Sequence, residues 1–289
     1  MTVHHLNCGS VRQIEATYDG LAPAHAVNHC LLVETASDGL VLIETGIGLD
    51  DVRDPAGTLG ADWVAMSQPV LSEDETAVRQ VQRLGYDPED VRHVILTHLD
   101  VDHSGGLPDF PHARVHVHAA PHAGAPRADP RKKNHHGARI PPPPTPGAPR
   151  AEAPSFRYRS AHWAHDPHWV TYPKDPTGKW FGFDAIQPKD LPDDFQLIPL
   201  GGHTAGHTGV AVREGERWLL HCGDAYYYHR ELDPQPQPHP ILDIVQTSAE
   251  VHHDLRVGTQ ARLRELHRDH GHEVTLLSAH DPWEFQRFR

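Results

Sequence analysis

Short apolar runs separated by polar turns recur along the chain. Residues 30–33 and 40–43 form two of these runs, and Ser37-Asp38-Gly39 between them predicts a β-hairpin. Later apolar-rich runs predict buried strands at 91–96, 195–200, 218–220 and 274–277.

Helical spacing of apolar residues occurs in two segments. Residues 72–75 match the S-x-x-E capping box, and apolar residues recur at helical spacing from Val78 to Leu84 before Gly85. This pattern predicts a helix that starts at the box and ends at the glycine. A second helix is predicted over 259–270, with Leu263 and Leu266 on one face.

Four of the predicted strands run into loops that carry histidine or aspartate. Loops at strand ends are where a rigid scaffold usually mounts its chemistry. If the four loops converge, their imidazoles and carboxylates would form a metal-binding cage. The loops are residues 97–103, 201–207, 221–224 and 278–281.

The segment 121–183 interrupts this pattern. Residues 121–154 hold 10 of the 27 prolines and six Lys/Arg against two Asp/Glu, so regular helix or central strand is excluded there. Residues 156–183 hold three of the six tryptophans, which favours packing against another surface. We therefore expect one domain over residues 1–289, with 121–183 as a long insertion that is first extended and then packed.

Composition and charge narrow the classes of function. The formal net charge of −13 argues against a nucleic-acid binder and against docking on anionic lipid. No run of 18 apolar residues occurs, and the first residues lack the basic and apolar parts of a secretory signal. Three cysteines without a C-x-x-C pair suit a reduced cytoplasm. We expect a cytoplasmic protein that acts on a small molecule.

The chain has 27 histidines, and we treat one as a candidate metal ligand or catalytic residue only where its spacing and neighbours in the sequence favour that role. His98-Leu99-Asp100-Val101-Asp102-His103 places four potential ligands in six residues and is followed by Gly105-Gly106. In an extended loop His98, Asp100 and Asp102 would point one way and His103 the other, so this segment alone could serve two adjacent metals. The two glycines would let the backbone turn tightly behind the cluster.

This loop resembles the signature of the metallo-β-lactamase-fold hydrolases, which usually reads H-x-H-x-D-H. The order of the later motifs is similar as well, over about residues 26–283 apart from the insertion. They are Glu44-Thr45-Gly46, Gly202-His203-Thr204-Ala205-Gly206-His207, Cys222-Gly223-Asp224 and Ala279-His280-Asp281.

The resemblance implies an α/β fold, a four-layer αβ/βα sandwich of two mixed sheets with helices outside and two divalent metal ions at one edge. It implies a first metal on His98, Asp100, His203 and Asp224, and a second on Asp102, His103, Asp224 and His280. Zinc is the first expectation. Because Asp100 replaces a histidine, its oxygen and negative charge also favour Mn²⁺ or Fe²⁺.

Other histidines are assigned more ordinary roles. By resemblance His207 supports its turn; the alternative is a zinc pair with His203, four residues earlier, on a helix that the glycines there disfavour. His116 and His118 on an alternating strand are expected to be solvated on an outer face, and His252 and His253 to be solvated on a helix or loop. A third metal site at His162, His165 and His168 is not expected, because no cysteine or clustered acid accompanies them.

The implied chemistry is hydrolysis by a metal-bridging hydroxide, with Asp102 orienting it and moving its proton. Asp224-Ala225-Tyr226-Tyr227 matches the D-A-x-Y of the acyl-homoserine lactonases of this family, in which the tyrosine donates to the substrate carbonyl. Tyr227 is therefore a candidate catalytic residue, with a packing role as the alternative. A small ester-like bond, a lactone first, is the expected substrate, and thioester or β-lactam cleavage would use the same groups.

Three other functions stay open. A nuclease would draw on the basic residues 127–139, a redox diiron protein would bind iron at the H-x-D-x-D-H loop, and a non-catalytic binding or sensor protein would keep the cage without turnover. The insertion 121–183 is either a cap over an apolar substrate or an arm across a homodimer partner.

Overall fold

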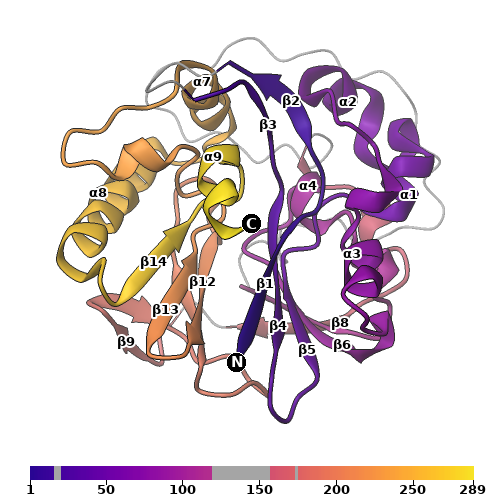
Figure 1. The fold of residues 1–289 in the computed structure, drawn as a ribbon, viewed down its shortest axis with the longest axis horizontal. Helices are drawn as coiled ribbons and strands as arrows, with labels where there is room; N and C mark the ends of the chain where they lie inside the picture. The colour runs from indigo at the N-terminus through magenta and orange to yellow at the C-terminus, as the bar shows by residue number, and fades with distance from the viewer. Residues whose placement is uncertain (16–20, 119–156, 173–174) are drawn as a thin grey trace.

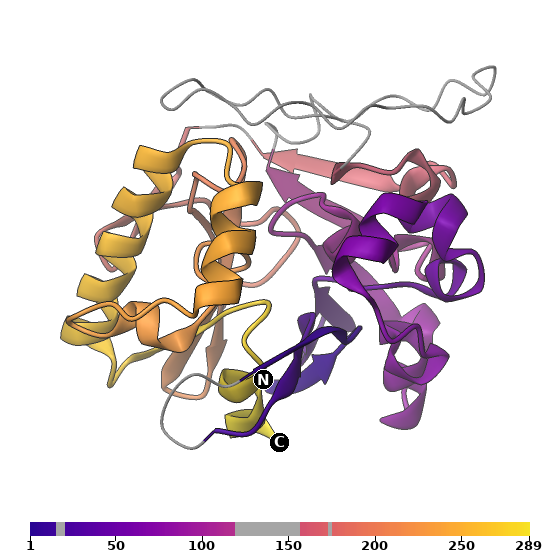
Figure 2. The same ribbon diagram turned by 90° about the horizontal axis from the view of Figure 1, so that it is seen from above.

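Two mixed β-sheets packed face to face form the centre of the molecule, and helices cover the outer face of each sheet (Figure 1). The view from above shows helices flanking both sides of the sheets (Figure 2). The computed structural model describes residues 1–15, 21–118, 157–172 and 175–289. The layered αβ/βα architecture that the resemblance implied is confirmed.

The first sheet has six strands in the order β1-β4-β5-β6-β7-β8. The predicted hairpin at 30–43 is confirmed, since β4 and β5 pair antiparallel with Leu31 opposite Ile43. From β5 to β8 the strands run parallel. The strands are β1 (Thr2–Asn7), β4 (His29–Glu34), β5 (Leu40–Ile43), β6 (Val91–Ile95), β7 (Arg114–His118) and β8 (His168–Tyr172).

The second sheet has four strands in the order β11-β12-β13-β14, antiparallel except for the parallel pair β13 and β14. Two small two-stranded sheets complete the described strands. The strands of the second sheet are β11 (Phe195–Pro199), β12 (Thr208–Glu214), β13 (Arg217–His221) and β14 (Val274–Leu277), and the small sheets are β2 (Val11–Ile14) with β3 (Ala24–Ala26) and β9 (Gly178–Trp180) with β10 (Phe183–Ala185).

The two predicted helices are present with different starts. The helix predicted from the capping box is α3 and begins only at Ala77, because the Glu75 carboxylate accepts hydrogen bonds from the Ser10 backbone N–H and hydroxyl and does not cap the helix. The predicted 259–270 helix begins six residues earlier. The described α-helices are α1 (Leu49–Arg53), α2 (Ala61–Ser67), α3 (Ala77–Arg83), α4 (Val101–Ser104), α7 (Pro240–Ala249), α8 (His253–His270) and α9 (Pro282–Phe285).

Alternation along the strands divides the apolar core among the layers. Leu31 and Val33 of β4 face the second sheet, whereas Cys30 and Leu32 face the helices outside the first sheet. The core between the sheets contains Val41, Ile43, Ile95, Phe195, Leu197, Val210, Val212, Leu219 and Leu277. Leu263 and Leu266 of α8 pack against the outer face of the second sheet, as their helical spacing predicted.

The described part of the predicted insertion packs into the domain. β8 extends the edge of the first sheet by pairing with β7. Most of its described aromatic residues are buried, as expected, and the buried ones are Tyr158, Trp163, Tyr172, Trp180 and Phe183. The prolines of 121–154 fall outside the described residues, so the cap and the arm stay predictions.

The expectation that His116 and His118 are solvated is wrong. Both are buried on β7, because β8 covers the edge that an alternating surface strand would leave open. The imidazole of His116 lies 2.8 Å from Nδ1 of His93 and 2.6 Å from the hydroxyl of Tyr172. Burial lowers the pKa of His116 to about 3, so the ring is neutral.

The longest described helix, α8, has 18 residues, and neither it nor any other helix in the described ranges combines the length and apolar character that a bilayer-spanning segment needs.

Leu197→Ala should lower the free energy of unfolding by about 2–5 kcal/mol, because it opens a cavity between the two sheets. Leu255→Ala on the outside of α8 is the matched control, since that side chain is 50% exposed and should cost less than about 0.5 kcal/mol. Urea unfolding followed by tryptophan fluorescence compares the two. Equal losses would contradict the placement of the core.

Candidate metal centre

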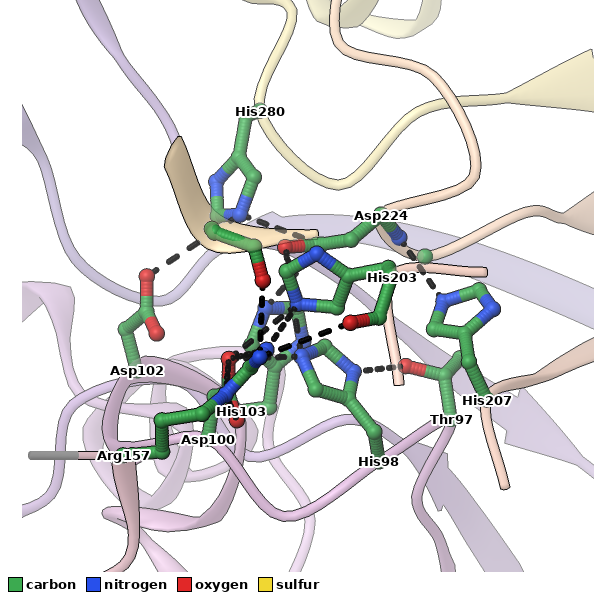
Figure 3. Close-up of polar contacts among 12 residues, drawn as sticks. Thr97, His98, Asp100, Asp102, His103, Arg157, His203, His207, Asp224 and His280 are labelled. Atoms are coloured by element: carbon green, nitrogen blue, oxygen red, sulfur yellow. Dashed lines mark hydrogen bonds and ion pairs between the residues drawn. The ribbon is translucent and has the colours of Figure 1, made fainter. Parts of the chain in front are cut away.

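All four loops predicted to carry ligands meet at one edge of the two sheets (Figure 3). β6 belongs to the first sheet and leads into His98, whereas β11, β13 and β14 of the second sheet lead into His203, Asp224 and His280. The structure therefore brings together every residue that the sequence proposed as a metal ligand, from both sheets.

The first group of donors surrounds one point. Nε2 of His203 lies 3.1 Å from Oδ2 of Asp100 and 3.4 Å from Oδ2 of Asp224, and Nε2 of His98 lies 3.4 Å and 3.9 Å from the same two oxygens. Donors bound to one tetrahedral cation at about 2.0–2.1 Å are about 3.3 Å apart. His98, His203 and Asp224 match this spacing as a buried triplet.

A second group lies on the other side of Asp224. Oδ1 of Asp224 is 3.2 Å from Nε2 of both His103 and His280. Oδ2 of Asp102 lies 3.9 Å from Nε2 of His280. Asp224 thus presents one oxygen to each group, which is the arrangement of a carboxylate that bridges two cations.

Three buried atoms test whether cations fit here. Nε2 of His98, Nε2 of His103 and Oδ1 of Asp224 have no hydrogen-bonding partner among the described residues. An unsatisfied buried polar atom is costly, and three of them among the candidate ligands, one in the first group and two in the second, indicate missing ligands. Imidazole and carboxylate donors suit zinc, manganese or iron, so the residues fit a pair of divalent cations.

Hydrogen bonds behind the ligands set the imidazole tautomers. Nδ1 of His103 lies 2.7 Å from Oε2 of Glu44, and Nδ1 of His280 lies 2.9 Å from the carbonyl oxygen of Val27. Each oxygen accepts a hydrogen bond from Nδ1–H and so leaves Nε2 as the nitrogen that can bind a cation. Glu44 also accepts from the backbone N–H of Thr97, so it joins both ends of the 97–103 loop.

His207 supports Asp224 from behind. Its Nδ1–H donates to the carbonyl oxygen of Leu200 at 2.9 Å, and its Nε2 accepts from the backbone N–H of Asp224 at 3.0 Å. Burial lowers the pKa of His207 to about 3, which keeps the ring neutral and able to accept. Both ring nitrogens are therefore engaged away from the candidate cations.

The sequence predicts an extended 98–103 loop, but the structure shows that only its first part is extended. Asp100 precedes helix α4, and the backbone N–H groups of His103 and Ser104 bond to its carbonyl oxygen. This helical turn, and not strand alternation, directs Asp102 and His103 to the second group. The glycines behind the loop serve close approach, since a Cβ at Gly106 would lie 2.7 Å from the carbonyl oxygen of Thr45.

The charges of the site are strongly coupled. Burial opposes ionisation of Asp224, but His280 and His103 outweigh it and hold the pKa of this carboxyl well below its ordinary value. Burial, reinforced by His103, lowers the pKa of His98 to about 3. Asp224 is thus ionised and His98 neutral, as cation binding requires. Asp224 outweighs burial and raises the pKa of His103 and His280, so each of these imidazoles must give up a proton when a cation binds.

Sequence reasoning missed Arg157, whose guanidinium reaches into the first group (Figure 3). Its Nε lies 2.9 Å and 3.1 Å from the two oxygens of Asp100, and its Nη2 lies 2.6 Å from Nε2 of His203. Arg157 is a single arginine 57 residues from Asp100, and no motif or spacing in the sequence indicates that the two residues are in contact. Its charge balances that of Asp100, so the negative-charge part of the argument for harder metals no longer holds.

Tyr227 also reaches the site. Its hydroxyl donates to Oδ2 of Asp224 at 2.6 Å, and its ring lies 5.0 Å from that of His280. Burial and the adjacent carboxylate raise the pKa of Tyr227 well above its ordinary value, so the hydroxyl keeps its proton.

His162 has a structural role. Its Nε2 lies 2.9 Å from Oδ1 of Asp51 and its Nδ1 lies 3.2 Å from the hydroxyl of Ser104. His162, Asp51 and Ser104 are all buried. Their hydrogen bonds hold the side chain of Ser104, the residue that follows the candidate ligand His103.

Known proteins are similar to this chain in sequence. The family model described as Metallo-beta-lactamase superfamily matches residues 26–274. A probable metallo-hydrolase of Mycobacterium tuberculosis is 38% identical over 289 residues, covering 99% of this chain and 82% of the relative. The N-acyl homoserine lactonase AttM of Rhizobium radiobacter is 37% identical over 262 residues, covering 88% of this chain and 82% of the relative.

Solved structures share the fold. An N-acyl homoserine lactone hydrolase with the product N-hexanoyl-L-homoserine at its catalytic metal center gives a TM-score of 0.66 at 16% identity, covering 99% of this chain and 96% of that one. AidC, a dizinc quorum-quenching lactonase, gives 0.54 at 18% identity, covering 90% and 74%. At these identities the likeness concerns the fold.

Glu44→Gln should weaken the binding of Zn²⁺ by about 10- to 100-fold. The amide can accept only through one atom, so either the N–H of Thr97 or that of His103 faces another N–H. Titration of metal-free protein against a chromophoric chelator measures the change. Glu34→Gln, on a strand far from the ligands, is the control, and equal affinities in all three proteins would contradict the role of Glu44.

Proposed function

Since the chain belongs to the metallo-beta-lactamase superfamily of metal-dependent hydrolases, we propose that it is a dinuclear enzyme that opens small lactones. His98, Asp100, His203 and Asp224 would hold one cation, and Asp102, His103, Asp224 and His280 the other. Zinc is proposed for both sites, because two imidazoles and carboxylates serve each of them.

The position of Tyr227 is the observation that carries the lactone proposal. A protonated hydroxyl donates to Asp224 at the centre of the site, so a donor already stands beside the atoms that would hold the cations. A carbonyl oxygen that gains negative charge during hydrolysis needs such a donor. The relative from Rhizobium radiobacter, named as a lactonase, supports the same substrate class.

Two bound cations would supply Lewis-acid polarisation and a water whose pKa is lowered to about 7. Asp102 has a side chain that is 17% exposed, more than the other carboxylates of the site, so it can orient that water and pass its proton toward solvent. Tyr227 would then turn its hydroxyl from Asp224 to the substrate carbonyl. Glu44 and His207 would hold their ligands in place throughout.

The proposal is tested on protein purified without chelators or a histidine tag. About two zinc ions per chain together with opening of acyl lactones, followed as acid release, is the expected result. Turnover of thioesters or β-lactams without turnover of lactones would contradict the lactone substrate but would still support a hydrolase. A metal-loaded protein that cleaves neither lactones, thioesters nor β-lactams would contradict the proposal that it is a hydrolase. Two bound iron ions together with oxygen consumption would indicate a redox function and not hydrolysis.

Tyr227→Phe should lower kcat for a lactone by about ten- to a hundredfold, because a donor to the reacting carbonyl is removed. The zinc content should be unchanged, because the hydrogen bond lost from Asp224 leaves all the ligand atoms in place. Tyr226→Phe is the matched control. That hydroxyl donates to Glu284, away from the ligands, so its loss should reduce thermal stability but not kcat. The same kcat for wild type and Tyr227→Phe would assign Tyr227 a packing role.

A further inference from the structure

Arg157 has all its guanidinium donors engaged inside the candidate metal centre. Nε bonds to Asp100, and Nη1 donates to the carbonyl oxygens of Ala249 at 2.8 Å and His203 at 3.4 Å. Nη2 contacts both Asp100 and Nε2 of His203. Because the side chain is only 10% exposed, these contacts replace water and hold the guanidinium in one position.

One of these contacts competes directly with cation binding. An arginine can only donate, so in its contact with Nη2 the Nε2 of His203 accepts through its lone pair. Nη2 also contacts Oδ2 of Asp100, which lies 3.1 Å from the same Nε2, so the guanidinium bridges the two ligand atoms. A cation bound to Nε2 would need the same lone pair. Entry of a cation into the first group therefore requires the loss of a charge-assisted hydrogen bond, and it brings a second positive charge close to a buried guanidinium.

The second group has no such competitor. Among the residues that the structure describes, no arginine or lysine side chain hydrogen-bonds or ion-pairs with Asp102, His103 or His280. Nε2 of His103 is without a partner there, and its tautomer is set by Glu44. A cation can bind there without displacing an arginine or a lysine, and only the contacts of the His103 and His280 imidazoles with Oδ1 of Asp224 would change.

We propose that Arg157 is a positioning residue that makes the two cation sites unequal. It weakens the site of His98, Asp100, His203 and Asp224, so that the site of Asp102, His103 and His280 fills first. The inference rests on the proposed dinuclear centre. It predicts that the protein binds Zn²⁺ in two distinguishable steps.

Metal-free full-length protein is titrated with Zn²⁺ in competition with a chromophoric chelator, and native mass spectrometry counts the bound ions. In the wild type the two dissociation constants should differ by at least about tenfold. Arg157→Met keeps the length of the side chain and removes the guanidinium, so the weaker step should tighten by about ten- to a hundredfold while the tighter step is unchanged.

Two further variants guard against misfolding and general charge effects. Arg157→Lys keeps the positive charge but loses the planar fork, so its weaker step should lie between those of wild type and Arg157→Met. Arg159→Met is the matched control, because that arginine donates to the carbonyl oxygen of Leu59 outside the site and should leave both steps unchanged. Circular dichroism confirms that each variant is folded.

Ligand variants assign the steps to the sites. His203→Ala should abolish the weaker step and His280→Ala the tighter one. The inference would be overturned if the wild type bound Zn²⁺ in two equal steps or if the ligand variants gave the reverse assignment. It would also be overturned if both Arg157 variants bound Zn²⁺ as the wild type does. None of these outcomes would contradict the proposed dinuclear hydrolase. A wild-type protein that binds no Zn²⁺ would overturn the proposed function as well.

Discussion

The buried carboxylate of Asp224 is the group on which the site depends. Four imidazoles approach its two oxygens at 3.2–3.9 Å, and it is almost completely removed from water. A carboxylate in such a place is tolerated only with compensating charge and hydrogen bonds. His207 holds its backbone, and Gly223 before it permits this contact, since a Cβ there would lie 2.6 Å from Nε2 of His207.

The packing of the two sheets brings the ligands around Asp224 together. His98, Asp102 and His103 follow the first sheet, whereas His203, Asp224 and His280 follow the second. The apolar core between the sheets therefore sets the distances within the site, although none of its residues takes part in the chemistry. Loss of packing there would separate the two halves of the ligand set.

Charge balance explains how the site accommodates an extra acid. Asp100 adds a carboxylate at a place where a histidine is usual, and Arg157 adds a guanidinium that pairs with it. The pair is together neutral, as an imidazole would be. It differs from an imidazole in being held by the backbone of Ala249 and His203, which ties Arg157 to the last residue of helix α7 and to the 201–207 loop.

The sequence by itself determined the apolar strands, the polar loops that follow them and the order of the ligand motifs. Strand and helix periodicity and the spacing within a loop are local properties, and the order of the motifs can be read directly along the chain. Hence the 30–43 hairpin and the 91–96 strand could be predicted from local pattern. The seven candidate ligands were named by the resemblance of these motifs to the metallo-β-lactamase-fold hydrolases.

Only the tertiary structure decided which distant groups meet. Glu75 bonds to Ser10 across 65 residues and does not cap its own helix, and Arg157 reaches Asp100 across 57. His116 is buried because β8 pairs beside its strand. Each outcome depends on a partner far along the chain, and a side chain's burial, charge state and hydrogen bonds are set by neighbours in space, which local periodicity does not encode.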